Sequence, residues 1–464
     1  MTCTPLLILN GQPIAYQNCI KYLGLIFDSQ LSWIPHLNQL KKDCKQRLNL
    51  LKSLSNYEWG ADKNTLKLLY KTLILSKIDY GSIIYGAANK NILKTIDAIH
   101  HAGLRFAIGA FRTSPTISIL CEAGEPTLEL RREKIVSNYA IACISNNNHI
   151  NSTLFTTQAL NTQPHHPRII PLNIRAQKIL SSLNKPLPIP TYKYPSVTPF
   201  WLTKSPSTHL DLSVYIKTET NPKFYTNKLN EIINDKFLNH ELIYTEGSVK
   251  NHKTGCAFIH KDYNEMYRLA EDTSNYTAEA VAIIKALKYI KQSENKQYVI
   301  LSDSTSVLKS IKNCLSPNPL IKQFSDLNKD VHNNGKTVDY IWTPSHIGIA
   351  GNEAADKLAK EATEKPNIDE KVLTTYDLKK SIHKNLRQKW EIQWKVFDPL
   401  TNKLRSIRAT TFFDGGYHKL TRRKDQVDIT RLRIGHTRVT HGHLMRKEPP
   451  KMCEQCQAPI IKIT

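Results

Sequence analysis

The segment TPSHIGIAGNEAAD, residues 343–356, decides how the chain is interpreted. Its first half contains proline and glycine, which is typical of a loop, and this loop carries His346. Its second half opens a helical segment over residues 352–364, in which Asn352 and Glu353 are expected to cap the helix. The apolar run at 338–342 immediately before the segment predicts a strand.

Strands and helices alternate on the N-terminal side of this segment. Residues 241–244, 255–259 and 298–301 are candidate strands, and a long helix is expected over 276–290. Strands mixed with helices of this length predict an α/β domain that begins near residue 239.

Four acidic residues lie at successive element ends: Glu246, Glu279, Asp303 and Asp356. Ligands of open α/β sheets gather beyond the carboxyl ends of the strands. Glu246 and Asp303 follow two of the strands, so they meet if those strands are parallel neighbours. One such acid alone would be interpreted as a solvated surface charge, whereas four in this order predict a shared site.

Converging carboxylates suit the hydrolysis of a phosphodiester. The reaction needs an activated water and stabilisation of the leaving 3′ oxygen, and two divalent ions about 3.5–4 Å apart provide both. Mg²⁺ prefers hard oxygen ligands, so several carboxylates must converge to hold such a pair.

The motifs TEGS at 245–248, TAE at 277–279, SDS at 302–304 and the segment 343–356 together resemble the type 1 ribonuclease H family. The last of them is similar to the form in insect-type LINE (non-LTR) retrotransposons. The resemblance covers residues 239–365 and implies a ribonuclease H-like mixed five-stranded sheet with flanking helices. It implies endonucleolytic cleavage of the RNA strand of RNA–DNA hybrids with two Mg²⁺ or Mn²⁺ ions.

The resemblance also implies a role for each site residue. The metal ligands would be Glu246, Glu279, Asp303 and Asp356. His346 would assist water activation or product release, as a neutral imidazole near pH 7 can carry a proton. Asn275 matches a position that contacts the nucleic acid. Specificity for the hybrid would rest on recognition of RNA 2′-hydroxyl groups.

One residue departs from the family pattern. The first carboxylate of the family is normally aspartate, and here it is Glu246. Glutamate keeps the charge but adds a methylene group, and Mg²⁺ is demanding in its geometry. The alternative is therefore a catalytically impaired, nucleic-acid-binding retroelement fragment. A third possibility is a retroelement fragment that does not fold stably.

The regions that flank this domain carry weaker signals. Residues 1–150 are predicted to be mostly helical, and KYLGLIFD at 21–28 and SKIDYG at 76–81 resemble the thumb side of LINE reverse transcriptases. No Tyr-x-Asp-Asp motif occurs, so we do not expect polymerase activity, and a plain helical scaffold is the alternative. Residues 151–238 are rich in Asn, Thr, Pro and Ser, which predicts a linker.

Residues 366–464 form a basic C-terminal region that contains a C-x-x-C motif, Cys453 and Cys456. Two thiolates at this spacing are half of a tetrahedral zinc site. The further ligands of the family lie downstream of such a motif, and the chain ends at Thr464. His441 or His443 would have to replace them.

The charge distribution points to nucleic acid. The formal net charge is +24, yet residues 239–370 contain 16 Lys and Arg against 18 Asp and Glu. Residues 371–464 contain 21 basic and 8 acidic residues. Basic regions therefore flank a slightly acidic domain, which suits affinity for a polyanion beside a carboxylate site. The alternative is that the lysines only promote solubility.

Membrane and secretory signals are weak. No apolar run approaches the roughly 18 residues that span a bilayer, and no basic segment precedes the short apolar stretch at 5–9. The nine cysteines are scattered, which favours a reducing intracellular compartment over a disulfide framework. We expect an intracellular protein without a membrane partner.

Overall fold

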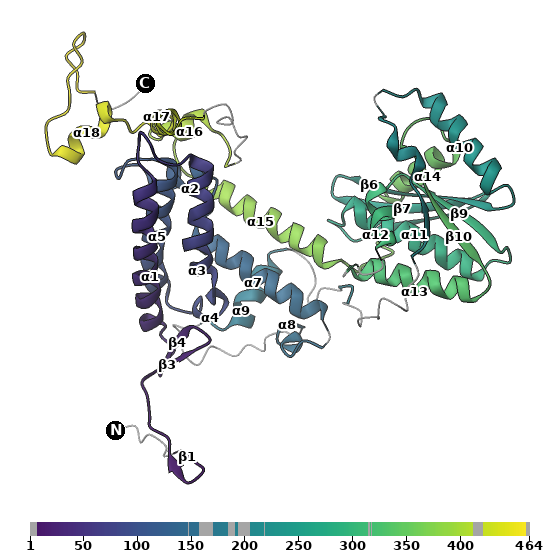
Figure 1. Cartoon of the computed structure of the whole chain (residues 1–464), viewed down its shortest axis with the longest axis horizontal. Helices are drawn as coiled ribbons and strands as arrows, with labels where there is room; N and C mark the ends of the chain where they lie inside the picture. The colour runs from purple at the N-terminus through teal and green to yellow at the C-terminus, as the bar shows by residue number, and fades with distance from the viewer. Residues whose placement is uncertain are drawn as a thin grey trace. The chain divides into compact units, whose positions relative to one another are not determined.

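The computed structural model describes residues 7–146, 148–156, 170–183, 191–193, 205–217, 219–313, 316, 318–411 and 421–460. The chain forms two compact units (Figure 1). The helical unit comprises residues 1–139, 159–184 and 382–464, and the sheet unit comprises residues 140–158 and 185–381.

A mixed sheet of six strands forms the centre of the sheet unit, in the order β5-β10-β9-β6-β7-β8. Its strands are β5 (Ser207–His209), β6 (Glu241–Lys250), β7 (Lys253–His260), β8 (Tyr263–Leu269), β9 (Gln297–Ser302) and β10 (Thr337–Trp342). Strands β5, β10, β9 and β6 are parallel, and the β6–β7 and β7–β8 pairs are antiparallel. Five of the six residues of β9 are buried, as expected for a central parallel strand covered on both faces.

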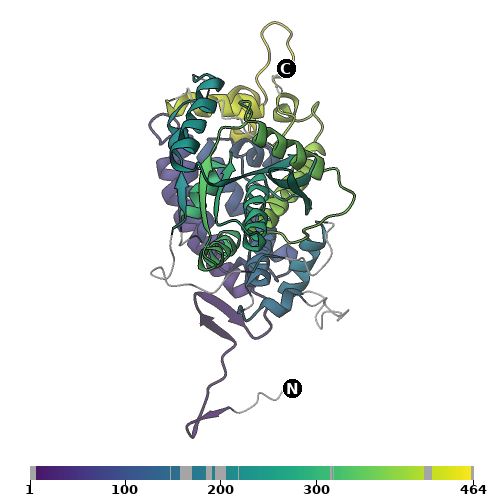
Figure 2. The same ribbon diagram turned by 90° about the vertical axis from the view of Figure 1, so that its right-hand side faces the viewer.

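Helices cover both faces of this sheet (Figures 1 and 2). The helical elements of the sheet unit are α8 (Ser152–Thr156), η3 (Asp211–Val214), α10 (Pro222–Lys236), α11 (Asn275–Gln292), α12 (Thr305–Lys312), α13 (Pro319–Asn333) and α14 (Ala350–Ala362). One core joins α11, α12 and α13 to the first face through residues such as Ile300 and Tyr340. A second core joins α10 and η3 to the opposite face through Leu301 and Ile341.

The predicted ribonuclease H-like mixed sheet is confirmed, with one strand more than expected. The sixth strand, β5, comes from segment 151–238, for which composition predicts a linker. The described parts of this segment also contain α8, α9 (Leu172–Ser181), η3 and α10, while residues 157–169, 184–190 and 194–204 lie outside the described residues. Composition misses η3 and α10 because their apolar residues, such as Leu212 and Leu229, are few and are buried against the sheet.

The helical unit is built around α1 (Ile34–Leu54) and α5 (Lys90–Ile108), which share one core. The shorter N-terminal elements are α2 (Lys63–Tyr70), η1 (Lys71–Leu75), α3 (Ser76–Asp79), α4 (Ser82–Tyr85), α6 (Thr116–Ala123) and α9 (Leu172–Ser181). Helix α7 (Leu128–Ser145) contributes residues to both units. The predicted helical character of the N-terminal region is confirmed.

Two short hairpins precede these helices. Strands β1 (Ile8–Leu9) and β2 (Gln12–Pro13) form the first, and β3 (Cys19–Tyr22) and β4 (Leu25–Asp28) form the second. The first hairpin extends away from the helices of its unit in both views (Figures 1 and 2). Among the described residues, no helix has the length and apolar character that crossing a membrane requires.

Most of the basic C-terminal region belongs to the helical unit. Its helices are α15 (Thr375–Lys395), which begins in the sheet unit, α16 (Lys403–Ile407), α17 (Arg423–Ile434) and α18 (Arg438–Arg446). Trp394, Leu404 and Ile434 are buried in the core of the N-terminal helices. Segments that are distant in sequence thus complete one hydrophobic core.

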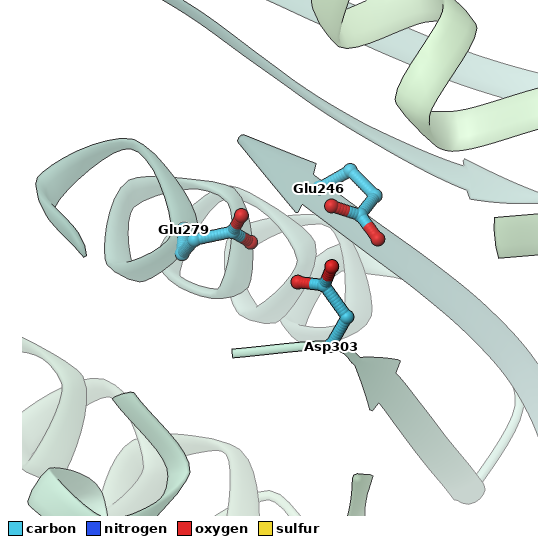
Figure 3. A group of neighbouring side chains, drawn as sticks. All are labelled: Glu246, Glu279 and Asp303. Atoms are coloured by element: carbon cyan, nitrogen blue, oxygen red, sulfur yellow. The ribbon is translucent and has the colours of Figure 1, made fainter. Parts of the chain in front are cut away.

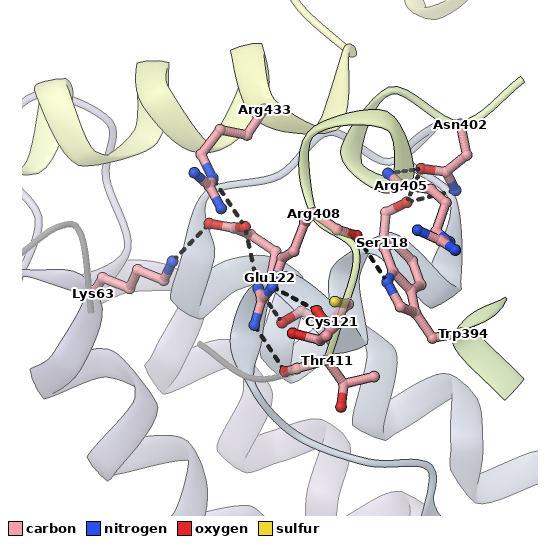
Figure 4. A network of polar contacts seen from close by, with 11 residues as sticks. Lys63, Ser118, Cys121, Glu122, Trp394, Asn402, Arg405, Arg408, Thr411 and Arg433 are labelled. Atoms are coloured by element: carbon pink, nitrogen blue, oxygen red, sulfur yellow. Dashed lines mark hydrogen bonds and ion pairs between the residues drawn. The ribbon is translucent and has the colours of Figure 1, made fainter. Parts of the chain in front are cut away.

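A buried ion network joins the same segments (Figure 4). The side chain of Glu122 on α6 has 0% exposure and contacts three cations. Its carboxylate lies 3.0 Å from Lys63 Nζ, 3.3 Å from Arg433 Nε and 3.8 Å from Arg408 Nη1. Arg408 also donates to the backbone oxygen of Cys121 at 2.9 Å. The charge of Glu122 is therefore compensated within the fold.

Candidate active site

Three of the predicted acids converge at one end of the sheet. Glu246 lies on β6, Glu279 lies on α11, and Asp303 follows β9. One carboxylate oxygen from each lies within 4.8 Å of the others, and the three side chains point toward one another (Figure 3). Glu246 and Glu279 are 3% and 1% exposed, and Asp303 is half-buried.

Strand register explains two of these positions. Strands β6 and β9 are parallel neighbours, and Thr245 lies opposite Ser302. Glu246 directly follows Thr245 within β6, and Asp303 directly follows Ser302 at the end of β9, so the two acids lie at the same level on adjacent segments. The sequence predicted this meeting on the condition that the two strands are parallel neighbours, which they are. It placed Glu246 after the end of its strand, whereas β6 continues to Lys250 and Glu246 lies within it.

Helix α11 approaches this end of the sheet closely because Gly247 follows Glu246. A Cβ atom at Gly247 would lie 2.8 Å from Ala278 Cβ and 2.8 Å from the backbone nitrogen of Glu279. Only glycine leaves room for such an approach. The approach places Glu279, on the first turns of the helix, beside the two strand carboxylates.

The electrostatics of this cluster oppose ionisation. Burial above all, and then the charges of Asp303 and Asp356, raises the pKa of Glu246 to about 9. Burial, followed by the charges of Glu246 and Asp303, raises the pKa of Glu279 well above its ordinary value. Burial also raises the pKa of Asp303, against the positive charges of His346 and Lys217. Carboxylates in such a setting ionise fully only when a cation compensates them.

Asp356 lies near the cluster but outside the group of three. It is carried by α14, its side chain is 18% exposed, and its Oδ2 accepts a hydrogen bond from Lys360 Nζ at 2.5 Å. Its charge acts on Glu246 and Asp303. The structure therefore brings three of the four predicted ligands together and pairs the fourth with the next turn of its own helix.

The loop with His346 lies between β10 and α14. His346 is exposed and has a φ of 51°, in the left-handed region, and Gly348 has a φ of 87°. The backbone nitrogen of Gly348 donates to Glu353 Oε1 at 2.9 Å. Glu353 was expected to cap α14, and it instead anchors the loop that precedes this helix.

Two asparagines contact the cluster. Asn352, also expected to be a cap, is buried, and its Nδ2 donates to Glu246 Oε1 at 2.7 Å. Asn275 is exposed, and its Nδ2 donates to Glu279 Oε1 at 3.4 Å. The role of Asn352 escaped the sequence interpretation because an asparagine near a helix start equally suits a cap.

Two further residues near the cluster come from outside residues 239–365. Lys217 Nζ donates to Ser345 Oγ at 3.1 Å, next to His346. Asp377 is fully buried and accepts hydrogen bonds from Ser274 N at 3.0 Å and Thr277 Oγ1 at 2.8 Å, at the start of α11. Neither belongs to a recognisable motif, so sequence reasoning missed both.

No zinc site forms at the C-terminal motif in the described part of the chain. Among the described residues, the three carboxylates are the one group of His, Cys, Asp and Glu side chains that could hold a metal ion. Cys453 is half-buried and Cys456 is exposed, and both are free thiols. His441 stacks on His436 with ring centroids 3.6 Å apart.

The chain is similar to known ribonucleases H. The family "RNase H" matches residues 239–364. The chain is 30% identical over 145 residues to a ribonuclease H of Ruthia magnifica subsp. Calyptogena magnifica, which covers 28% of this chain and 98% of that protein. A solved structure of LC11-RNase H1 in complex with RNA/DNA hybrid is 18% identical, has a TM-score of 0.23, and covers 26% of this chain and 96% of that chain.

The chain is also similar to mobile-element polyproteins. It is 25% identical over 178 residues to the RNA-directed DNA polymerase from mobile element jockey of Drosophila melanogaster, which covers 35% of this chain and 19% of that protein. It is 21% identical over 131 residues to a Pol polyprotein from a type-1 retrotransposable element R1 of Nasonia vitripennis, with 28% of this chain and 33% of that protein covered. The chain thus spans a fraction of the length of these polyproteins.

Proposed function

Since this chain belongs to the ribonuclease H family through residues 239–364, we propose that it cleaves the RNA strand of RNA–DNA hybrids by metal-assisted hydrolysis. The activity would reside in the sheet unit. Its ribonuclease H domain is of the kind found in non-LTR retrotransposon polyproteins.

The convergence of Glu246, Glu279 and Asp303 carries this proposal. Their oxygens are the hard donors that Mg²⁺ and Mn²⁺ prefer. The donor set fits a divalent cation for a second reason, because burial and mutual repulsion raise the pKa of all three groups. A dication would offset that repulsion and restore the ionised forms.

Two divalent cations bound at this site would supply an activated water and stabilisation of the leaving 3′ oxygen. Glu246, Glu279 and Asp303 would hold these ions. Asp356 would become a further ligand if its carboxylate turned away from Lys360. His346, exposed on its loop and close enough to act on Asp303, takes up or delivers a proton at an imidazole nitrogen. Asn352 holds Glu246 in place through its 2.7 Å hydrogen bond.

Recognition of the hybrid is assigned to the edge of the same cluster. Asn275 is exposed at the start of α11 and reaches the carboxylate of Glu279, so its amide can contact a bound sugar or base edge. Contacts to 2′-hydroxyl groups distinguish RNA from DNA in such sites.

The proposal is tested with purified full-length protein and a labelled RNA–DNA hybrid, with and without Mg²⁺ or Mn²⁺. We expect metal-dependent cleavage of the RNA strand, and a loss on the order of 10³-fold or more in Asp303→Asn. Asp235→Asn is the matched control, because Asp235 is an exposed aspartate on α10. Equal rates for Asp303→Asn and the parent would overturn the assignment of the site.

A non-catalytic hybrid-binding module is the second candidate function. The observation that favours it is Glu246, which stands where the family normally has aspartate. In that case the parent binds the hybrid in the presence of Mg²⁺ or Mn²⁺ but cleaves neither strand.

A further inference from the structure

Lys217 enters the site from a segment that precedes the ribonuclease H match. Strand β5 starts this segment and pairs with β10, with Ser207 opposite Asp339. Leu212 on η3 is then buried in the second core of the sheet unit. The backbone oxygen of Tyr215 accepts a hydrogen bond from the buried Tyr225 at 2.9 Å. These contacts fix the course of the chain up to two residues before Lys217.

A turn then presents the lysine side chain. The backbone nitrogen of Glu219 donates to the oxygen of Ile216 at 3.0 Å, which closes the chain around Lys217. The ammonium group donates to Ser345 Oγ at 3.1 Å on the loop that carries His346. Its charge also acts on Asp303. The ammonium therefore lies beside the loop of His346, where its charge acts on one acid of the cluster.

The ammonium group of Lys217 forms no salt bridge with the described residues. Among the described residues, the contact of Lys217 Nζ is with the Ser345 hydroxyl and not with a carboxylate, and Lys217 is exposed. One of its three N–H donors serves Ser345, so two remain for a ligand. A lysine held at a polar site with donors to spare is a point charge suited to a phosphate oxygen.

We propose that Lys217 binds a backbone phosphate of the nucleic acid beside the bond that is cleaved. This inference rests on the proposed function, since it concerns the same site and substrate. It extends the substrate-binding surface beyond residues 239–364, to a segment that the family match does not include. Ser345 positions the ammonium and links it to the loop of His346.

The test compares Lys217→Ala, Lys217→Arg and Lys236→Ala. Lys236 is the matched control, because it is an exposed lysine on the last turn of α10 in the same unit. Affinity for the hybrid is measured at several salt concentrations in the Asp303→Asn background, which prevents cleavage. Steady-state cleavage is measured in the parent background.

Lys217→Ala should raise KM and the dissociation constant about tenfold, with kcat within about threefold of the parent. The slope of log affinity against log salt should become shallower by about 1, as for the loss of one phosphate contact. Lys217→Arg should keep the parental slope because it keeps the charge. Lys236→Ala should behave like the parent.

Three results would overturn the proposal. One is an unchanged affinity and salt slope in Lys217→Ala, and another is an equal loss in Lys236→Ala. The third is a fall in kcat with an unchanged KM, which would place Lys217 in the chemical step. Failure of the proposed function is distinguishable, because then the parent itself does not cleave the hybrid, whereas the contribution of Lys217 to affinity is measured in the Asp303→Asn background.

Discussion

Each unit of the molecule buries glutamate, but in opposite settings. In the helical unit, Glu122 is surrounded by Lys63, Arg408 and Arg433 (Figure 4). In the sheet unit, the strongest charges around Glu279 are those of other carboxylates (Figure 3). The first arrangement stabilises its fold, whereas the second stores repulsion that a divalent cation would relieve. Burial of an acid alone therefore does not identify a functional site. The charge of the neighbouring side chains, positive around Glu122 and negative around Glu279, distinguishes the two settings.

The largest effect on stability is expected in the helical unit. Glu122→Ala should lower the free energy of unfolding of this unit by about 3–5 kcal/mol, since it leaves buried cations uncompensated. Glu129→Ala is the control, because Glu129 is 60% exposed and its pair with Lys90 spans 3.7 Å. The control should cost less than about 1 kcal/mol. Urea denaturation followed by circular dichroism measures both, and similar losses would remove the contrast between the units.

Glu279→Gln should have the opposite sign in metal-free protein. It removes an ionisable group from a cluster that opposes ionisation, so the free energy of unfolding of the sheet unit should stay constant where Glu279 is protonated and rise relative to the parent at higher pH. Cleavage should fall sharply at the same time. Thermal unfolding with a chelator present, together with the cleavage assay, checks both effects. A clear destabilisation would mean that Glu279 supports the fold as Glu122 does.

The same repulsion predicts a pH dependence. The pKa of Glu246 is about 9 in the folded state against 4.5 ordinarily, so the folded protein binds more protons than the unfolded chain between these values. The stability contributed by this group is complete below about pH 4.5 and is lost as pH rises toward about 9. The Tm of the metal-free sheet unit should fall across this range, and saturating Mg²⁺ should reduce the fall. An equal pH dependence with and without Mg²⁺ would contradict this prediction.

The smallest expected effect is that of Glu246→Asp. The shorter side chain restores the residue that the family uses, and cleavage should rise by about tenfold or less. Affinity for the hybrid should hardly change because the charge is kept. Equal rates would mean that the site tolerates glutamate. Hybrid binding without cleavage in both versions would leave the binding module as the function.

The sequence predicted the parts of the site that lie on regular elements. Register brings Glu246 and Asp303 together because their strands are parallel neighbours, which is the condition that the sequence analysis set for their meeting. The pairing of Asp356 with Lys360 could not be predicted from the sequence. The side-chain rotamer of Asp356 decides whether its carboxylate contacts Lys360 on the same helix or the other three acids. The buried contact of Asn352 with Glu246 was hidden for a similar reason.

Long-range packing accounts for the remaining differences. Asp377 accepts hydrogen bonds from the start of α11, although it belongs to a segment in which basic residues outnumber acidic ones. No local sequence pattern distinguishes Asp377 from a surface aspartate. Trp394 and Ile434 complete the core of the N-terminal helices from the far end of the chain. Removing residues 371–464 would therefore disrupt both units. Such a deletion would not isolate the effect of the basic charge of this region on affinity for nucleic acid.

Strand β5 protects the edge of the sheet at β10 from pairing with another chain. A parallel sheet that ended at β10 would expose a full row of unpaired backbone donors and acceptors, which is a template for pairing with another chain. The three residues of β5 cover Asp339, Tyr340 and Ile341, and so short an outer strand offers little to an incoming one. A fragment that began at residue 239 would keep the carboxylate cluster but lose this cover. We expect such a fragment to aggregate at concentrations where residues 205–381 stay dispersed.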